Sequence, residues 1–408
     1  MSSSSPLVYC FLKVETTFMP DLPTIDRQQL PFGIPDAAWK RKLRRQLLRW
    51  YAEHQRDLPW RKRRDPYAIW ISEMMLQQTQ VATVIPYFQR FLETFPTIQA
   101  LAEAPEEQVL REWEGLGYYR RARNLHAAAK KIQSDHGGIF PQTFDEVQAL
   151  PGIGRYTAGA ILSIAFDLRL PILEANTIRL FSRLIGYRGD PRSLLGTKLL
   201  WYVAEDWLPR KEVGHFNQAL MELGSLICTP KEPKCPQCPA QKICIAKQEG
   251  WQQEIPQPAA KTVYEEVQEV AIILRKEDEV LLFKQEEAGR WAGMWDFCRF
   301  PWSGEVPQKN TLPGFAPSYE NFEKALNKKL YELQDFTIKK IQYFNTLKHG
   351  VTRFRITLEC FTAEPNDLDF LQRINSLRKN RQWVKIKDLN DFPLNVTARK
   401  IAKQLQNS

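Results

Sequence analysis

The sequence predicts a two-domain protein, in which an all-helical domain is followed by a smaller domain of mixed α and β structure. Three observations support this fold class. A chain of 408 residues is long enough for several folded units. From Asp36 to about Cys244, apolar residues recur at intervals of three and four, as on one face of a helix. After residue 262, short runs rich in branched and aromatic residues indicate β-strands.

Changes in this pattern give the expected domain boundaries. Residues 250–262 lack periodicity and contain Pro256 and Pro258, which is typical of a linker. The first 35 residues contain several prolines and lack the basic start and cleavage site of a secretory signal. The expected parts are a loose extension at 1–35, a helical domain at 36–227, a cysteine-rich loop at 228–249, a linker at 250–262 and the mixed domain at 263–408.

The second domain is expected to combine a sheet with two helices. Helical spacing is found at 321–333 and 396–404. The expected strands are 267–274, 280–284, 296–300, 337–346, 352–362 and 382–386.

The composition predicts a soluble globular protein with a basic surface. Hydrophobic residues make up 43% of the chain and charged residues 25%. No apolar stretch reaches the roughly 18 residues that a membrane-spanning helix needs, so no membrane association is expected. The net charge is +10, and the first 250 residues contain 33 basic against 26 acidic residues. This excess is compatible with a polyanionic partner but does not by itself identify one.

Four of the seven cysteines lie in one short segment. Cys228, Cys235, Cys238 and Cys244 have the spacing C-x6-C-x2-C-x5-C, while the other three are scattered. Four thiolates in one loop can surround a metal centre, and sulfur ligands suit iron-sulfur clusters or zinc. The alternative is a group of four free thiols. We expect a metal site in a protein of a reducing compartment, because a secreted disulfide framework would not be distributed in this way.

Two further segments have the character of functional sites. The turn at 150–154 contains Gly152 and Gly154 and precedes a helix, so its backbone can approach a phosphate at the helix start. The alternative is a simple reversal between two helices. Glu73 lies in an apolar, amide-rich helical segment at 70–80, where partial desolvation favours a carboxylic acid that keeps its proton. The alternative is an ordinary solvated carboxylate.

These segments carry a family resemblance. The cysteine spacing resembles the 4Fe-4S loop of endonuclease III-like DNA glycosylases, and residues 70–86 and 115–125 are closely similar to MutY-type adenine DNA glycosylases. The resemblance implies a helix-hairpin-helix glycosylase domain with a structural 4Fe-4S cluster. It also implies that Glu73 protonates an adenine flipped out of double-stranded DNA, while Gln78 and Tyr118 enter the vacated position.

The resemblance extends to Tyr156, Glu174 and Asn176. Endonuclease III-like relatives carry a lysine at the position of Tyr156, and tyrosine cannot form the Schiff base that permits strand cleavage. MutY enzymes have Asp-Gly-Asn where this chain has Glu174, an alanine and Asn176. Glu174 therefore preserves an anion that could stabilise or attack the sugar, and Asn176 could orient a catalytic group. The alternative role of Glu174 is to cap a helix start.

Residues 290–297 resemble the start of the MutT-like, Nudix-type domain of MutY enzymes, which recognises 8-oxoguanine. Only Glu323 and Glu332 lie near the helix that would bind magnesium in a Nudix hydrolase, so pyrophosphate hydrolysis is not expected. Alignment on His349 puts Thr352 and Arg353 in the lesion-recognition hairpin, where the family carries Phe-Ser-His after the upstream histidine. The alternative is that Arg353 is an exposed strand charge.

The sequence therefore predicts a monomeric glycosylase that acts on adenine opposite 8-oxoguanine or guanine, in the cytoplasm or nucleoid. Two alternatives are a superfamily glycosylase for another base and a mismatch-sensing DNA-binding protein that has lost catalysis through Glu174.

Overall fold

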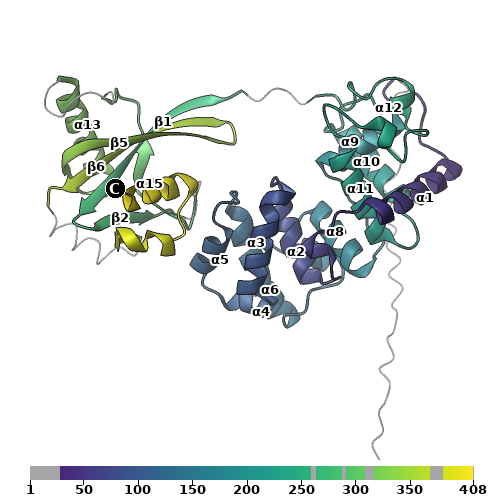
Figure 1. The fold of residues 1–408 in the computed structure, drawn as a ribbon, viewed down its shortest axis with the longest axis horizontal. Helices are drawn as coiled ribbons and strands as arrows, with labels where there is room; N and C mark the ends of the chain where they lie inside the picture. Colours follow the sequence, from purple (N-terminus) through teal and green to yellow (C-terminus); the bar gives the residue numbers. More distant parts are fainter. Residues whose placement is uncertain (1–27, 259–262, 287–290, 308–316, 368–379, 408) are drawn as a thin grey trace, which may run out of the picture. The chain divides into compact units, whose positions relative to one another are not determined.

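The computed structural model describes residues 28–258, 263–286, 291–307, 317–367 and 380–407 (Figure 1). Residues 1–27 of the expected extension lie outside this range. The chain forms two compact units, the first from residues up to Asp57 and Gly154–Pro258, and the second from Leu58–Ile153 and the part after Pro258. The helical region is thus divided between the units. No helix in the described part of the chain is both long enough and apolar enough to cross a bilayer.

The first unit is a helical bundle around a large apolar core. Its helices α1, α8, α9, α10, α11 and α12 span Ala37–His54, Arg155–Phe166, Ala175–Ile185, Leu194–Asp206, Val213–Leu226 and Ile245–Gln248. Helix α11 packs against α1, α8 and α9. Trp207 is fully buried between the rings of Trp39 and Phe181. These large aromatic surfaces are removed from water together, which stabilises the bundle.

Part of the segment 28–35 is anchored to this core. Leu30 is buried in the same cluster, and the Gln29 carbonyl accepts a hydrogen bond from the Arg188 backbone N–H at 2.8 Å. Within the segment expected to be loose, Leu30 and Gln29 thus contact the bundle through an apolar side chain and a backbone hydrogen bond.

The second unit joins a set of helices to the C-terminal sheet. Helices α2 to α7 span Pro66–Leu76, Val81–Thr94, Ile98–Glu103, Glu106–Trp113, Arg120–His136 and Phe144–Gln148. The strands β1 to β7 span Glu265–Lys276, Glu279–Lys284, Trp295–Asp296, Cys298–Pro301, Ile338–Val351, Phe354–Pro365 and Arg381–Lys385. The sheet order is β3-β2-β1-β6-β5, with β4 on β1 and β7 on β2, and β1 and β6 run parallel.

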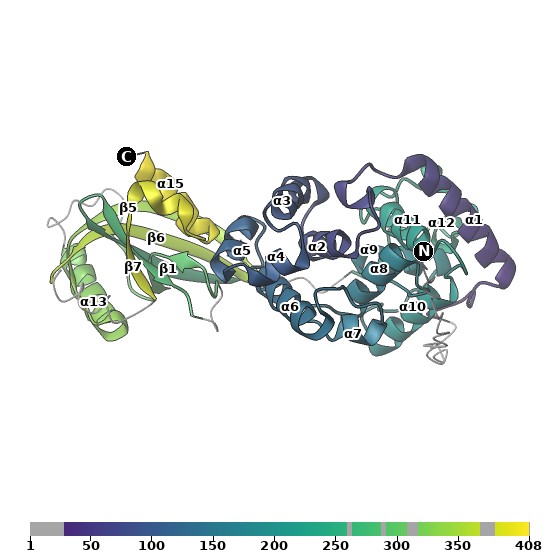
Figure 2. The same cartoon turned by 90° about the horizontal axis from the view of Figure 1, so that it is seen from below.

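The two faces of the sheet are covered by different helices. Along β1, Val270 and Ile272 pack in the cluster that contains residues of α13 (Pro317–Gln334), whereas Ala271 and Ile273 pack with residues of α15 (Val396–Gln406). Figure 2 shows α13 and α15 on opposite sides of the strands. This alternation is the period of two expected for a strand that is buried on both faces.

The expected strands are present with small differences. The run at 296–300 is interrupted, because Trp295–Asp296 pairs with β2 while Cys298–Pro301 pairs with β1. The buried Asp296 side chain accepts a hydrogen bond from the Phe297 N–H between the two segments. The strand expected at 337–346 continues to Val351 and forms a long hairpin with β6.

Candidate active site

Glu73 is a buried carboxylate on helix α2. The side chain of Asp65 caps the start of this helix and accepts a hydrogen bond from the Tyr67 N–H at 3.0 Å. Every residue of Ile69–Met75 is buried, and Glu73 is 7% exposed. The structure therefore agrees with the expectation that this carboxyl group lies among apolar side chains rather than on a solvated face.

Gln78 and Tyr118 lie in two backbone turns of the second unit. Gln78 follows the end of α2 with a φ of 57°, and Tyr118 precedes α6 with a φ of 50°. Residues other than glycine adopt this left-handed conformation at a cost of about 1–2 kcal/mol, so surrounding contacts must stabilise it. Tyr118 is 52% exposed and available for contact with a ligand.

The buried guanidinium of Arg121 connects these two turns. It donates hydrogen bonds to the carbonyls of Met74, Met75 and Gln77 at 2.9, 2.9 and 2.5 Å. It also donates to the Thr79 hydroxyl and to the carbonyls of Leu116 and Gly117, at 3.2, 3.3 and 3.2 Å. Burial lowers the pKa of Arg121 to about 10. Arg121 was not predicted from the sequence, because its burial on α6 is evident only in the structure.

One pocket of about 560 Å³ gathers several of the expected residues. Gln78 and Tyr118 line it from the helical turns, and Thr352 lines it from the β5–β6 hairpin. The remaining lining residues are Gln77, Gly117, Tyr119, Arg120, Arg121, Asn124, Trp291, His349, Gly350, Val351, Val396 and Thr397. Arg353 does not line this pocket. The volume is sufficient for a nucleobase-sized group, and the lining combines aromatic surface with a few polar groups, as ligand sites do.

The tip of the β5–β6 hairpin carries Thr352 and Arg353. Thr352 has a φ of 53°, and its hydroxyl donates to the Val351 carbonyl at 2.7 Å. The Arg353 guanidinium lies 3.2 Å from the Glu265 carboxylate and 5.2 Å from the centre of the Phe354 ring. Both side chains of this ion pair are more than half exposed. Arg353 is thus paired with Glu265 in the protein alone.

The base of the same hairpin is supported by Arg299. This buried guanidinium forms an ion pair with Glu269, lies 3.1 Å from His349 Nε2 and stacks 4.3 Å from the centre of the Trp291 ring. His349 and Trp291 both line the pocket, so Arg299 orients two of its side chains without lining it. The contribution of Trp291 was not predicted.

The hairpin at 150–154 connects the second unit to the start of α8. Gly152 has a φ of 78°, and a Cβ atom there would lie 2.7 Å from Asn124 Cβ, so only glycine fits. Gly154 is the N-cap of α8 and provides no side-chain cap. Backbone N–H groups at such a helix start are suited to an anion such as a phosphate.

Glu174 is the N-cap of helix α9 in the first unit. Its carboxylate oxygens accept hydrogen bonds from the Asn176 and Thr177 backbone N–H groups at 2.8 and 2.9 Å. The Thr177 hydroxyl in turn accepts from the Glu174 N–H at 2.8 Å, which completes a capping box. The alternative reading of Glu174 as a helix cap is therefore correct in geometry, and it leaves a carboxylate with a defined orientation.

Burial is the largest influence on the Glu174 carboxyl group. Desolvation raises its pKa above the ordinary value of 4.5, and the hydrogen bonds from Asn176 and Thr177 oppose this effect. The effect of desolvation on the pKa of Glu174 is therefore larger than the opposing effect of the hydrogen bonds that cap the helix. Glu174 consequently has a greater tendency to hold a proton than an exposed glutamate.

A chain of polar contacts connects Glu174 to the cysteine loop. Asn176 Nδ2 donates to Glu174 at 3.2 Å, and Asn176 Oδ1 accepts from Arg179 at 2.9 Å. Arg179 Nε then donates to the Cys228 carbonyl at 2.7 Å. Arg183, one turn later, donates to Cys228 Sγ at 3.3 Å. One helix, α9, therefore contacts both the carboxylate and the first cysteine.

The four cysteines of the loop line a single pocket. Cys228, Cys235, Cys238 and Cys244 surround it together with side chains that include Arg183. Burial raises the pKa of the Cys238 thiol to about 12 and that of Cys244 to about 11. Among the described residues, no three His, Cys, Asp or Glu side chains are arranged as ligands of a single metal ion. The four thiols expected to bind a metal centre nevertheless lie around one pocket.

The expected catalytic residues belong to both units. Glu73 lies in the second unit, and Tyr156, Glu174 and Asn176 lie in the first. Tyr156 is in the first turn of α8, and its hydroxyl donates to Met221 Sδ at 3.9 Å.

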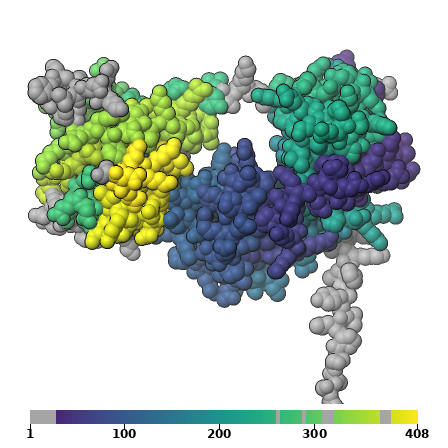
Figure 3. Space-filling model, viewed as in Figure 1, coloured from purple at the N-terminus to yellow at the C-terminus, as the bar shows by residue number. Residues whose placement is uncertain are grey.

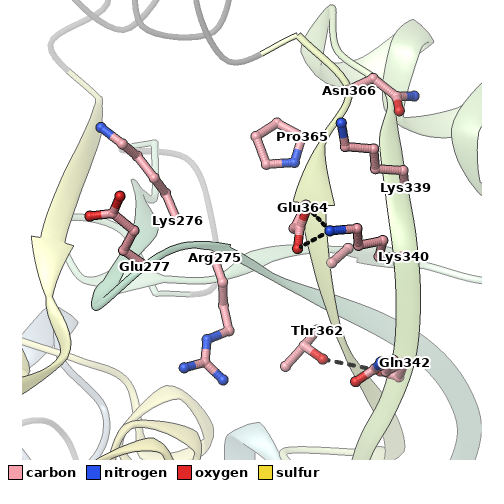
Figure 4. Close-up of a pocket in the computed structure, with 11 residues that line it drawn as sticks. Arg275, Lys276, Glu277, Lys339, Lys340, Gln342, Thr362, Glu364, Pro365 and Asn366 are labelled. Atoms are coloured by element: carbon pink, nitrogen blue, oxygen red, sulfur yellow. Dashed lines mark hydrogen bonds and ion pairs between the residues drawn. The ribbon is translucent and has the colours of Figure 1, made fainter.

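A separate basic pocket of about 600 Å³ lies at the other end of strand β5 (Figure 4). It is lined by Arg275, Lys276, Lys339 and Lys340, and Lys340 pairs with Glu364 at 2.9 Å. The eleven residues between Lys340 and Thr352 separate it from the hairpin tip by about 40 Å along the strand. It is therefore distinct from the pocket at Tyr118.

Two family models match the chain. Residues 71–203 match the HhH-GPD superfamily of base excision DNA repair proteins, and residues 269–404 match the NUDIX domain. The predicted fold class, a helix-hairpin-helix glycosylase fold followed by a Nudix-like α+β domain, is confirmed.

Curated proteins with similar sequences identify the family more closely. An adenine DNA glycosylase of Buchnera aphidicola subsp. Schizaphis graminum is 35% identical over 87% of this chain and 96% of its own length. The chain belongs to the adenine DNA glycosylase family. The rat adenine DNA glycosylase is 48% identical over 50% of this chain, and the match spans 42% of the rat protein. Among solved structures, a thermostable thymine-DNA glycosylase is 29% identical with a TM-score of 0.49, covering 52% of this chain and 100% of that chain.

Arg121→Lys tests whether one guanidinium holds both turns of this adenine DNA glycosylase family member. Lysine keeps the charge but cannot reach six acceptors, so amide hydrogen exchange should accelerate by about tenfold or more at 76–80 and 115–119. Arg120→Lys, an exposed neighbour on α6, is the control and should leave these amides unchanged. Unchanged exchange in Arg121→Lys would show that the turns are stable independently.

Glu174→Gln tests the raised pKa of Glu174. A raised folded pKa contributes stability that is present below the ordinary value of 4.5 and is lost as pH rises through the folded value. As pH rises from 4.5 through the folded pKa of Glu174, the free energy of unfolding of the parent relative to Glu174→Gln should therefore fall. The fall should be about 1.4 kcal/mol for each unit by which the folded pKa is raised. Urea unfolding as a function of pH measures it, with the exposed Glu249→Gln as control. An increase with pH would contradict the assigned direction.

Proposed function

We propose that the protein is a DNA repair glycosylase that releases adenine opposite 8-oxoguanine or guanine in double-stranded DNA. Residues 36–249 would carry the glycosylase chemistry, and residues 263–408 would recognise the opposite base. The protein would act as a monomer on DNA of the cytoplasm or nucleoid. Its excess of basic residues supports a salt-sensitive contact with the phosphate backbone.

The observation that carries this proposal is the shared pocket of Gln78, Tyr118 and Thr352. Gln78 and Tyr118 come from helical turns, whereas Thr352 comes from the Nudix-like domain more than 230 residues later in the chain. An enzyme that flips one base needs side chains that support the remaining one, because extrusion removes its stacking and pairing partners. The pocket provides an amide, an aromatic ring and a hydroxyl for that purpose.

In the proposed reaction, Glu73 gives its proton to a ring nitrogen of the flipped adenine. The bond between adenine and C1′ then breaks, and its electron pair leaves with the base. Burial of Glu73 on α2 supports this role, because a carboxyl group shielded from water is suited to deliver a proton.

Glu174 would stabilise the positive charge that develops on the sugar, or attack C1′ directly. The capping bonds and the Asn176 amide hold its carboxylate in one orientation, which supports a preorganised anion. Water would complete the reaction at C1′. In this proposal, Asn176 acts by orienting Glu174.

Tyr156 supports a reaction without a strand-cleaving step. A Schiff base with the sugar requires an amine, and the phenol of Tyr156 cannot provide one. The protein would therefore release the base and leave the strand intact. Gly152 and Gly154 would bind the DNA backbone through the turn and the start of α8.

Recognition of the opposite base would depend on Thr352 and Arg353. The Thr352 hydroxyl lines the pocket and can contact the altered edge of 8-oxoguanine. Arg353 lies outside the pocket lining and is paired with Glu265, so a phosphate contact would require exchange of that exposed ion pair.

The four cysteines fit a 4Fe-4S cluster. All four line one pocket, and Arg183 donates to Cys228 Sγ, as a hydrogen bond to a cluster ligand would. When bound, the cluster would fasten the loop and stabilise the fold next to α9. Cys228, Cys235, Cys238 and Cys244 would be its ligands.

The proposal is tested with a labelled duplex that contains one adenine opposite 8-oxoguanine. The full protein is incubated with the duplex, and half of each sample is treated with alkali. Strand cleavage at the adenine only after alkali would support base release without lyase activity. Cleavage without alkali would contradict the role given to Tyr156. Tight binding without base release would favour a mismatch sensor, in which case Glu174→Asp should restore turnover.

Glu73→Gln should abolish most of the base release. The amide has the same shape but cannot give up a proton, so the single-turnover rate should fall by about 10²–10⁴-fold while duplex binding is retained. Glu103→Gln, on an exposed part of α4, is the control and should release adenine at the parent rate. A normal rate in Glu73→Gln would exclude Glu73 as the acid.

The purified protein should contain about four iron atoms and four acid-labile sulfides per chain. Cys238→Ser should lose most of this iron, because one cluster ligand is removed. Cys360→Ala is the matched control, since Cys360 is buried in the sheet core of the second unit and does not line the cysteine pocket. Stoichiometric zinc, or equal iron loss in both variants, would contradict the assignment.

A further inference from the structure

Glu114 and Arg399 form a buried ion pair within the second unit. Glu114 ends helix α5, and Arg399 lies on α15, 285 residues later. Arg399 Nε and Nη2 donate to the two Glu114 carboxylate oxygens at 2.5 and 2.9 Å. The side chains are 9% and 13% exposed, respectively. Paired bonds of this kind are stronger and more directional than a single exposed contact.

The same two residues organise the backbone around them. Glu114 also accepts a hydrogen bond from the Leu394 N–H at 3.2 Å. Arg399 donates to the carbonyls of Leu389 and Phe392 at 2.8 and 2.7 Å. The pair therefore fastens the segment before α15, as well as the helix itself, to the end of α5. Figure 3 shows yellow C-terminal residues beside the blue helical residues of the same unit.

Glu114 and Arg399 are close in sequence to residues from two different segments that line the pocket. Glu114 directly precedes the turn that presents Tyr118, and Arg399 follows Val396 and Thr397, which also line the pocket. Tyr118 and the two α15 residues can form one pocket only while these segments remain together. The ion pair is thus close to the pocket in the chain without lining it.

A second ion pair joins the same parts of the chain but is exposed. Lys284 Nζ lies 2.8 Å from Glu107 Oε1, and the side chains are 36% and 49% exposed. An exposed pair is screened by solvent and contributes little. It therefore provides a matched control for the buried pair.

We propose that Glu114 and Arg399 are positioning residues that hold the Nudix-like domain against the Tyr118 turn, and so set the preference for 8-oxoguanine over guanine opposite adenine. The consequence for base preference rests on the proposed function. Contacts that Thr352 and its neighbours make with the opposite base can assist adenine release only if the Nudix-like domain and the Tyr118 turn keep their positions relative to each other. Release opposite guanine, which offers fewer such contacts, depends on the pair less.

The experiment compares full-length Glu114→Gln, Arg399→Gln, Arg399→Lys and the control Glu107→Gln. Single-turnover adenine release is measured on duplexes with 8-oxoguanine or guanine opposite adenine. The first two variants should lose about tenfold of the preference for 8-oxoguanine, with release opposite guanine nearly unchanged. Arg399→Lys keeps the charge and should lose less, while Glu107→Gln should match the parent. An equal fall on both duplexes would indicate only a structural role and overturn the proposal, as would a normal preference in Glu114→Gln.

Amide hydrogen exchange provides a readout that does not depend on glycosylase activity. In Glu114→Gln, exchange should accelerate at 389–399 and at 115–119, and Glu107→Gln should leave both segments unchanged. If the parent releases no adenine but the exchange result holds, the proposed function fails while the positioning pair stands. If exchange is unchanged in Glu114→Gln, the positioning role is wrong regardless of activity.

Discussion

The arrangement of the second unit depends on the burial of one guanidinium, that of Arg121. Removing this cation from water is costly, and the cost is offset only where several oxygen atoms converge on it. Those oxygens belong to the end of α2 and to the turn after α5. The two backbone segments must therefore approach each other, which explains how Gln78 and Tyr118 can both occupy left-handed conformations beside one pocket.

In the first unit, arginines of helix α9 likewise hold a distant backbone segment in place. The N-terminal cap of α9 is Glu174, and two successive later turns carry Arg179 and Arg183, which bind backbone and sulfur atoms of the cysteine loop. The orientation of the carboxylate is consequently linked to the structure of that loop through Asn176. A cluster bound by the loop would act on the proposed chemistry through position, since it would stabilise the helix that presents Glu174.

Features that depend on local sequence could be predicted, and features that depend on distant contacts could not. The cysteine spacing, the glycine turn at 150–154 and the apolar setting of Glu73 are visible within a few residues. The contacts of Arg121, Arg299 and Arg399 join segments that are far apart in the chain. An arginine in a sequence does not by itself show whether its side chain will be buried in the fold. The dual character of Glu174, as cap and as carboxylate, likewise became evident only from the hydrogen bonds at the start of α9.

The proposed function rests on Glu73 as the acid that protonates adenine and on Glu174 as the group that would shield or attack C1′ from the face opposite the departing base. Base release in the presence of methanol, followed by NMR assignment of the methyl deoxyriboside in the product, tests this claim directly. A carboxylate that attacks or shields that face leads to retention, so methanol should add on the face from which adenine left. Inverted product would contradict the account, because the face assigned to Glu174 would then be open to solvent.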